Sequence, residues 1–261
     1  MPCGAGTLQS SKEKIIKILL LDCETAPMTI YAWGLYNQNH NIDNIIQSGY
    51  VICWAAKWLG NDEIMFDSMD RGHEKMIARM HKLLHQADAV VHYNGLKFDI
   101  PTLNKEFVKY GMPPPSPYKN IDLYQSVKRL FRFESNKLDY VSQALGLGEK
   151  VKHRGFELWI DCMKGDKEAL SEMETYNRQD VVLLEKLYLH LLPWLTNHPN
   201  KATHNGQDCC PNCGSENYQR RGRAVTRAMS YKRYQCRDCG HWFKSTEHTK
   251  HNGSAFRQIT G

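Results

Sequence analysis

Apolar residues of this chain gather in short runs that are separated by polar segments and turn signals. Runs of roughly 4–8 apolar residues bounded in this way are typical of buried β-strands. Five segments fit the pattern, and we predict strands over residues 15–22, 50–58, 63–68, 89–93 and 121–124. A Gly-Asn pair between the second and third segments predicts a turn that joins those two strands.

Other segments show the spacing of helices. Residues 73–87 repeat apolar positions at intervals of three and four, which predicts a helix with one buried face. Pro101 suits the first turn of a second helix that runs to about Tyr110. Residues 138–145 and 168–192 predict two more helices. Strands followed by alternating strands and helices predict an α/β fold, in which a mixed sheet carries flanking helices.

The length and composition fit a globular protein. The chain has 261 residues, of which 41% are hydrophobic and 24% charged, enough for one large domain with or without a small module. No apolar run approaches the roughly 20 residues that span a bilayer. The N-terminus lacks the charged and apolar pattern of a signal segment. We therefore expect a cytoplasmic protein, and a phage or mobile-element origin would fit.

Positive charge is concentrated near the C-terminus. Residues 201–261 contain 11 Lys and Arg but 4 Asp and Glu, so this segment has a net charge of +7. The whole chain has a net charge of +6, so the remaining residues carry a net charge of −1. Such asymmetry indicates a tail that binds nucleic acid. A solvated basic end without a partner is the alternative.

Three sets of residues carry candidate chemistry in the first part of the chain. Asp22 and Glu24 end a predicted strand at positions i and i+2, so both point to one face, and a divalent metal would offset their repulsion. Asp99 precedes a predicted helix, and taken alone it reads as an N-cap. Tyr176 and Asp180 are four residues apart on a predicted helix and share a face. Each set alone has an ordinary structural explanation.

Taken together and in this order, the three sets resemble the DEDD superfamily of 3′→5′ exonucleases. Asp22-Cys-Glu24, Asn94-x-x-x-Phe-Asp99 and Tyr176-x-x-x-Asp180 match its tyrosine-bearing DEDDy branch, above all the proofreading domains of family B DNA polymerases and their stand-alone relatives. The stretch from Lys137 to Gly146 is also similar, and the resemblance covers residues 14–195. It implies a ribonuclease H-like fold with a five-stranded sheet.

The resemblance also implies a role for each matching residue. The ligands of two Mg²⁺ or Mn²⁺ ions would be the four acids Asp22, Glu24, Asp99 and Asp180. Tyr176 would orient the attacking water through its phenol, and Glu24 would also meet the terminal 3′ hydroxyl. The side chains expected to shape the groove for the substrate strand are Asn94, Phe98 and Thr25.

Several nearby residues have a simpler interpretation. Cys23 lies between the two acids and should point into the core. Asp122, at a transition from strand to helix, reads as a helix cap. The basic trio Lys152, His153 and Arg154 would suit a substrate phosphate, but a solvated loop is the favoured interpretation.

The C-terminal cysteines have the spacing of a zinc site. Cys210-x-x-Cys213 and Cys236-x-x-Cys239 form two pairs, each followed by Gly, which predicts one structural Zn²⁺ held by four thiolates. Cys209 fits this spacing less well and is expected to be a free thiol. The second pair and its flanks resemble zinc ribbons of some transposases.

Basic and aromatic residues alternate around the cysteines, which suits contact with phosphates and stacking on bases. The residues expected to bind nucleic acid are Arg220, Arg221, Arg223, Arg227, Lys232, Arg233 and Trp242. A zinc-stapled folding module and a protein-binding module are the alternatives.

These patterns predict a 3′→5′ exonuclease that acts on DNA, with a polymerase or other replication or repair protein as a partner in trans. An exonuclease that trims RNA and a non-catalytic nucleic-acid-binding adaptor are the alternatives. The expected organisation is a disordered N-terminus at 1–13, an exonuclease domain at 14–196, a linker at 197–206, a zinc ribbon at 207–250 and a flexible tail at 251–261.

Overall fold

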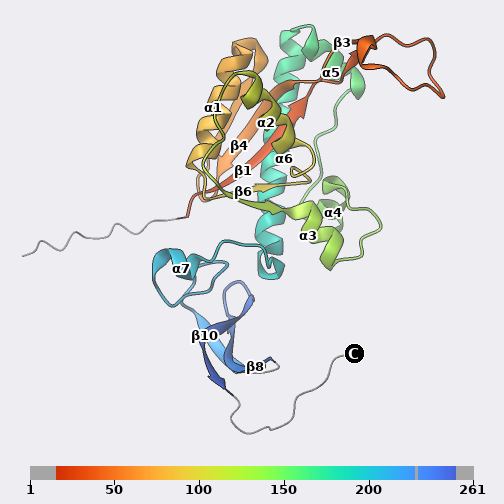
Figure 1. Ribbon diagram of the computed structural model, residues 1–261. Helices are drawn as coiled ribbons and strands as arrows, with labels where there is room; N and C mark the ends of the chain where they lie inside the picture. The colour runs from red at the N-terminus through yellow and green to blue at the C-terminus, as the bar shows by residue number, and fades with distance from the viewer. Residues whose placement is uncertain (1–15, 227–228, 251–261) are drawn as a thin grey trace, which may run out of the picture. The chain divides into compact units, whose positions relative to one another are not determined.

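The computed structural model describes residues 16–226 and 229–250, and the expected disordered start and flexible tail lie outside this part (Figure 1). The chain divides into two compact units, Lys17–Leu191 and the segment from Leu192 onward. Within the described residues, no helix combines the length and the apolar character that a membrane span requires.

A mixed sheet of five strands forms the centre of the first unit, as predicted, although the last strand covers residues 119–122 in place of the predicted 121–124. Its strands are β1 (Ile18–Thr25), β4 (Val51–Trp58), β5 (Ile64–Ser68), β6 (Ala89–His92) and β7 (Lys119–Asp122). The spatial order is β5-β4-β1-β6-β7, so β1 is central. β4 pairs with β1 and β5 in antiparallel fashion, whereas β6 pairs with β1 and β7 in parallel.

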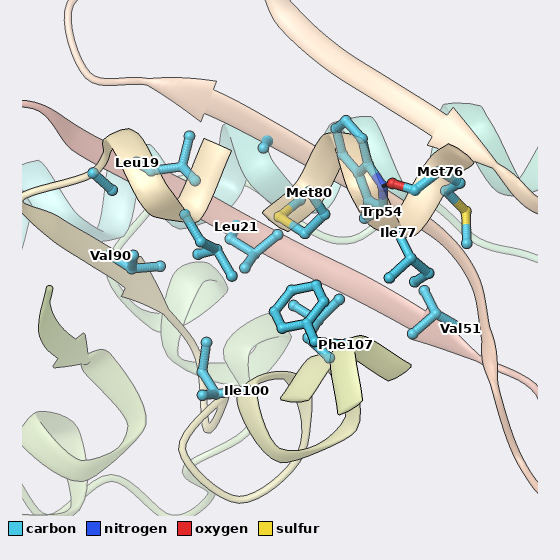
Figure 2. Packing of buried hydrophobic residues seen from close by; sticks show 14 residues of the cluster. Leu19, Leu21, Val51, Trp54, Met76, Ile77, Met80, Val90, Ile100 and Phe107 are labelled. Atoms are coloured by element: carbon cyan, nitrogen blue, oxygen red, sulfur yellow. Dashed lines mark hydrogen bonds between the residues drawn. The ribbon is translucent and has the colours of Figure 1, made fainter. Parts of the chain in front are cut away.

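Helices α1 (His73–Gln86) and α2 (Asp99–Lys109) cover one face of this sheet. Trp54 of β4 packs in this layer, and its indole Nε1 donates a hydrogen bond of 3.0 Å to the carbonyl of Met76 (Figure 2). Phe107 of α2 lies in the same cluster. Helix α1 was predicted from its apolar spacing and α2 from the position of Pro101, and the apolar residues of both helices are buried in this layer.

Helices α5 (Phe156–Met163) and α6 (Lys167–Leu191) enclose a second cluster with residues of β4 such as Ile52 and Cys53. The pattern predicted α6 but not the shorter α5. Helices α3 (Leu123–Leu130) and α4 (Leu138–Ala144) follow β7.

The remaining elements of the first unit are short. Between β1 and β4, the strands β2 (Thr29–Ile30) and β3 (Ile45–Gln47) form a two-stranded sheet. Two 3₁₀ turns, η1 (Ile42–Asn44) and η2 (Met69–Arg71), precede β3 and α1. None of these four elements was predicted, because they are too short to repeat a pattern.

The second unit contains a 3₁₀ turn η3 (Leu192–Trp194), helix α7 (Lys201–Asn205) and a sheet in the order β10-β9-β8. The strands are β8 (Tyr218–Val225), β9 (Met229–Cys236) and β10 (Trp242–Lys250), all antiparallel. Helix α7 lies within residues 197–206, where the sequence suggested a linker. It begins there because the side chain of Asn200 accepts a hydrogen bond from the backbone N–H of Thr203.

Candidate metal centres

Two carboxylates lie at the carboxyl end of β1. Asp22 and Glu24 are two residues apart, so the alternation of the strand directs both side chains to one face of the sheet. Leu19, Leu21 and Cys23 face the opposite side, where they pack against the cluster of α1 and α2. The expectation that Cys23 is a core residue is therefore confirmed.

Helix α6 brings a third carboxylate to the same place. Oxygen atoms of Asp22, Glu24 and Asp180 all lie within 4.8 Å of one another. Tyr176 lies one helical turn before Asp180, and both are buried. Asn177 is fully buried, and its Nδ2 donates a hydrogen bond of 2.7 Å to Oδ2 of Asp22. One helix thus supplies a candidate ligand, the phenol beside it and the amide that orients another ligand.

Asp99 lies beside the same end of β1, although its oxygens are not part of this group of three. It is the first residue of α2, and its Oδ1 accepts a hydrogen bond of 3.2 Å from the backbone N–H of Cys23. The reading of Asp99 as an N-cap is wrong, because Phe98 occupies the cap position without a side-chain cap bond. The carboxylate of Asp99 is instead turned toward the acids of β1.

The turn between β6 and α2 fixes this carboxylate, and only glycine fits at its centre. A Cβ on Gly95 would lie 2.6 Å from the ring of His92 and 2.9 Å from Oδ2 of Asp99. The His92 ring is fully buried, and its Nδ1 accepts a hydrogen bond of 3.2 Å from the N–H of Gly95. Burial also lowers the pKa of His92, which favours the neutral ring that can accept this hydrogen bond. The missing side chain is what allows ring and carboxylate to approach.

Asp122 holds the same turn from β7. Its carboxylate accepts backbone hydrogen bonds from Asn94 at 2.9 Å and Leu96 at 3.4 Å. It also caps α3 by accepting the N–H of Gln125, so the predicted cap is confirmed. Asp122 therefore holds the backbone of the turn that precedes Asp99, and it positions the Asp99 carboxylate in this indirect way.

Burial raises the pKa of the four candidate ligands Asp22, Glu24, Asp99 and Asp180. Burial and then the charge of Asp180 raise the pKa of Asp22 well above its ordinary value and that of Glu24 to about 8. Burial raises the pKa of Asp99 to about 6 and also raises that of Asp180. Burial also raises the pKa of Tyr176 to about 12, so its phenol keeps its proton. Acids held in this way ionise readily only when a cation is added.

Lys150 is a cation at this site that the sequence patterns did not reveal. Its Nζ forms an ion pair with Oδ2 of Asp180 and donates a hydrogen bond of 3.0 Å to the phenol oxygen of Tyr176. Burial lowers the pKa of Lys150, but the attraction of Asp180 outweighs it and holds the pKa above its usual value. The residue lies between α4 and α5 in a segment without regular structure, so no periodic pattern marked it.

The basic trio that follows Lys150 along the chain is only partly close to the acids. The ring of His153 meets the rings of Tyr176 and Trp159 edge-on, with centroids 5.0 and 4.9 Å apart. Trp159 hydrogen-bonds to Glu24. Arg154 pairs instead with carboxylates of α5 and α6. Ring contacts thus link His153 to the site, while Lys152 is exposed.

The three residues expected to contact substrate lie around the acids. Asn94 has a φ of 64° and lines a cavity of 380 Å³ together with Lys150. Its Oδ1 is buried and has no hydrogen-bond partner among the described residues. Phe98 is 63% exposed next to Asp99, and Thr25 is exposed after the bulge that follows Glu24.

The acidic group has the chemistry of a site for a hard divalent cation. Oδ1 of Asp180 is buried and lacks a hydrogen-bond partner among the described residues. An unpaired buried oxygen of this kind costs about 1–3 kcal/mol. Mg²⁺ and Mn²⁺ take carboxylate oxygens as ligands. Either ion would coordinate Oδ1 of Asp180 and would supply the positive charge that offsets the repulsion between the acids.

Four cysteines of the second unit form another candidate centre. The Sγ atoms of Cys210 and Cys239 are 3.7 Å apart, and those of Cys213 and Cys236 are 3.6 Å apart. All four sulfurs lie within 4.8 Å of one another. Tetrahedral Zn²⁺ with Zn–S bonds of about 2.3 Å places its sulfurs about 3.8 Å apart. The four thiols are therefore spaced for one zinc ion.

Each cysteine pair is closed by a glycine. Gly214 and Gly240 have φ angles of 84° and 83°, and their N–H groups donate to the carbonyls of Cys210 and Cys236. Residues other than glycine rarely adopt this left-handed conformation. Cys209 is buried and lies outside the group of four.

The basic residues expected to bind nucleic acid are exposed on the sheet of the second unit. Trp242 is 45% exposed, and the guanidinium of Arg233 lies 5.1 Å from the centre of its ring. Arg227 lies outside the described residues. The described members of the set are Arg220, Arg221, Arg223, Lys232, Arg233 and Trp242.

Comparison with known proteins agrees with this geometry. The model of the RNase H superfamily matches residues 20–192. The chain belongs to the RNase H superfamily. RNase H-like nucleases use divalent metal ions, and the group of Asp22, Glu24 and Asp180 is compatible with that use. No curated protein matches the chain.

A solved structure supports the same fold. The family B DNA polymerase from the hyperthermophilic archaeon Pyrobaculum calidifontis is similar with a TM-score of 0.51 and 19% identity. The similarity covers 69% of this chain and 25% of the polymerase chain, so this chain spans about a quarter of that protein. At this identity the likeness concerns the fold alone, and it agrees with the RNase H-like fold that the family match shows for residues 20–192.

Proposed function

We propose that the chain is a metal-dependent 3′→5′ exonuclease of the DEDDy type that acts on DNA. One observation carries the proposal: Asp22, Glu24 and Asp180 converge within 4.8 Å, and the phenol of Tyr176 lies one helical turn from Asp180. Membership of the RNase H superfamily and the polymerase-like fold support it.

Water would attack the phosphorus of the last phosphodiester bond, and the P–O3′ bond would break. The products are a nucleoside 5′-monophosphate and a strand with a new 3′ hydroxyl. The ions would be held by Asp22, Glu24, Asp99 and Asp180. When bound, two divalent ions supply the positive charge that favours the attacking water and the departing 3′ oxygen.

Tyr176 orients the attacking water as a hydrogen-bonding phenol. Burial raises the pKa of Tyr176 to about 12, so at neutral pH it keeps its proton and does not act as a strong base. Lys150 donates a hydrogen bond to the same oxygen, which fixes the direction in which the phenol can itself donate. Glu24 would meet the terminal 3′ hydroxyl and so impose the requirement for an end.

The last nucleotides of the strand would lie over the residues around the acids. Phe98 offers an exposed ring beside Asp99, and a base can stack on such a surface. Asn94 offers an amide in the cavity that Lys150 also lines. Thr25 follows Glu24 at the end of β1. Together these side chains would position the scissile phosphate.

The second unit would be a zinc ribbon that binds nucleic acid. Four thiols spaced for tetrahedral Zn²⁺ support the metal, and the basic and aromatic side chains of the sheet support the ligand. Holding the strand in this way raises its local concentration near the acids.

The test is a time course on single-stranded DNA labelled at its 5′ end, with magnesium, with manganese and with chelator. We expect products that shorten step by step from the 3′ end, with no products in chelator. Asp180→Asn and Asp99→Ala should abolish the reaction. Glu168→Gln removes an exposed carboxylate from the same helix α6 and should leave the rate unchanged.

The remaining outcomes identify the alternatives. Shortening of an RNA strand in preference to DNA would replace the proposed substrate with RNA. Internal cuts that do not depend on a free 3′ end would contradict the exonuclease assignment. No cleavage of DNA or RNA with either metal, while the strand is still bound, would favour the non-catalytic adaptor.

A further inference from the structure

Strand register separates the side chains of the C-terminal sheet into two faces. Arg233 of β9 lies directly opposite Lys244 of β10, so these two side chains share a face. Tyr231 lies two residues before Arg233 and belongs to the same face by alternation. Trp242, two residues before Lys244, belongs there as well. We call these four residues the ladder face.

Cations and aromatic rings alternate along the ladder face. The guanidinium of Arg233 lies 5.1 Å from the centre of the Trp242 ring, and Nζ of Lys244 lies 3.9 Å from the centre of the Tyr231 ring. Both cations and Trp242 are exposed. The resulting surface presents positive charge and flat apolar rings side by side.

The contacts that the sheet offers to these two cations are uncharged: Nε of Arg233 donates a hydrogen bond of 2.9 Å to the carbonyl of Arg221, and each cation lies over an aromatic ring. Like charges directly opposite each other on neighbouring strands are destabilising. Among the described residues, no carboxylate forms an ion pair with Arg233 or Lys244. A bound polyanion would offset both charges, and its phosphates would replace the absent carboxylates.

The opposite face of the sheet has its own partners. Lys232 pairs with Glu247 at 3.3 Å. The rings of Tyr218, Tyr234 and Phe243 pack against one another with centroids 5.4 to 5.6 Å apart. These contacts indicate a face that holds the small unit together.

We propose that the ladder face binds an unpaired stretch of nucleic acid, with phosphates at Arg233 and Lys244 and a base stacked on Trp242. The inference rests on the nucleic-acid role proposed for the second unit and narrows it to one face. It assigns Lys244 and Tyr231 to the binding surface. It also specifies single-stranded nucleic acid as the ligand, because a base inside a duplex has no free face on which the indole could stack.

The test measures binding of the full chain to a labelled oligonucleotide by fluorescence anisotropy, without added magnesium or manganese so that the strand is not consumed. The double variant R233A/K244A is compared with R220A/R223A and with K75A/K82A from helix α1. Arg220 and Arg223 pair with Tyr234 and Lys232, so they belong to the opposite face of the sheet. The three variants lose equal charge, and Lys75 and Lys82 are exposed. Zinc content and thermal unfolding confirm that each variant is folded.

We expect R233A/K244A to weaken binding most and to reduce the dependence of log K on log salt by about 1.4 for a single strand. K75A/K82A should bind as the natural chain does. Trp242→Ala should weaken single-strand binding by roughly 5- to 150-fold, with partial recovery in Trp242→Phe. The loss should be smaller for a duplex of the same length.

Three results would overturn the inference. An equal loss of oligonucleotide affinity in R220A/R223A and R233A/K244A would mean that the nucleic acid does not bind one face of the sheet in preference to the other. Equal loss of single-strand and duplex binding in Trp242→Ala would remove the stacking role. Failure of the folded natural chain to bind any oligonucleotide would favour a protein partner. Absence of hydrolysis with normal, ladder-dependent binding would count against the nuclease proposal alone.

Discussion

At the scale of single residues, the acidic site is held together against its own electrostatics. Asp22, Glu24 and Asp180 are fixed within 4.8 Å of one another, and Lys150 offsets only part of their charge. Their backbone positions come from β1 and α6, whose apolar residues are buried in the surrounding core. The buried core therefore holds these three carboxylates close together although their charges repel one another. Such a cluster of acids with shifted pKa values is typical of functional sites.

This cost predicts how stability depends on pH and on metal. Glu24 keeps its proton up to about pH 8 in the folded chain, against about 4.5 in the unfolded chain. Between these values the folded state holds more protons, so the free energy of unfolding falls as pH rises. Magnesium binds the ionised form, so the rise in Tm that it causes should be larger at about pH 8.5 than at about pH 5.5.

The measurement is thermal unfolding across this pH range with and without magnesium, beside Glu24→Gln. The variant cannot ionise at this position, so its metal-free Tm should depend less on pH and its response to magnesium should be smaller. A metal-free Tm that rises steadily from about pH 5.5 to about pH 8.5 would contradict the linkage.

Residues on regular elements were predictable, and residues that act across the fold were not. Alternation along β1 was enough to place Asp22 and Glu24 on one face. Asn177 looks like any polar residue of a helix, because its role depends on Asp22, which is 155 positions away in the chain. Lys150 lies in an irregular segment, where no period distinguishes a buried cation from a solvated one.

At the scale of elements, length decided which helices and strands could be recognised. Four strands of the central sheet and the long helix α6 repeat their apolar pattern often enough to be recognised, whereas β7 contains one apolar residue, Ile121, and the predicted strand over 121–124 overlaps it only at Ile121 and Asp122. Helix α5 has eight residues, and the strands of the second unit carry charged and aromatic residues in place of an apolar run. The sequence predicted the metal of that unit, but not the strands that surround it.

The turn that joins β6 to α2 gives a prediction at this scale. Gly95→Ala would force the ring of His92 and the carboxylate of Asp99 apart, because the new Cβ would lie 2.6 and 2.9 Å from them. We expect a loss of about 1–3 kcal/mol of unfolding free energy, the usual cost of an overfilled site. We also expect weaker binding of magnesium, measured by calorimetry.

Lys97→Ala is the matched control, because Lys97 is an exposed residue of the same turn. It should change neither stability nor magnesium binding. Unaltered metal binding in folded Gly95→Ala would show that the exact position of Asp99 is not important for the ions.

At the scale of the whole molecule, the two units derive their stability from different sources. Residues Lys17–Leu191 bury apolar clusters on both faces of a sheet. The unit from Leu192 onward buries few large side chains, and its four thiols lie at the spacing of a zinc site. A segment of this size usually requires a metal to fold. Removal of one thiolate should therefore affect one unit and spare the other.

Cys213→Ser tests this separation, with Cys209→Ser as the matched control because Cys209 lies outside the group of four. We expect Cys213→Ser to lose its bound zinc and the ordered sheet of the second unit, while the unfolding transition of the first unit stays at its temperature. Hydrolysis of a saturating short strand should continue at the natural rate, whereas the KM for that strand should rise because the tether is lost. Zinc analysis, calorimetry and steady-state kinetics measure the three effects. A common shift of both transitions would show instead that the two units unfold as one.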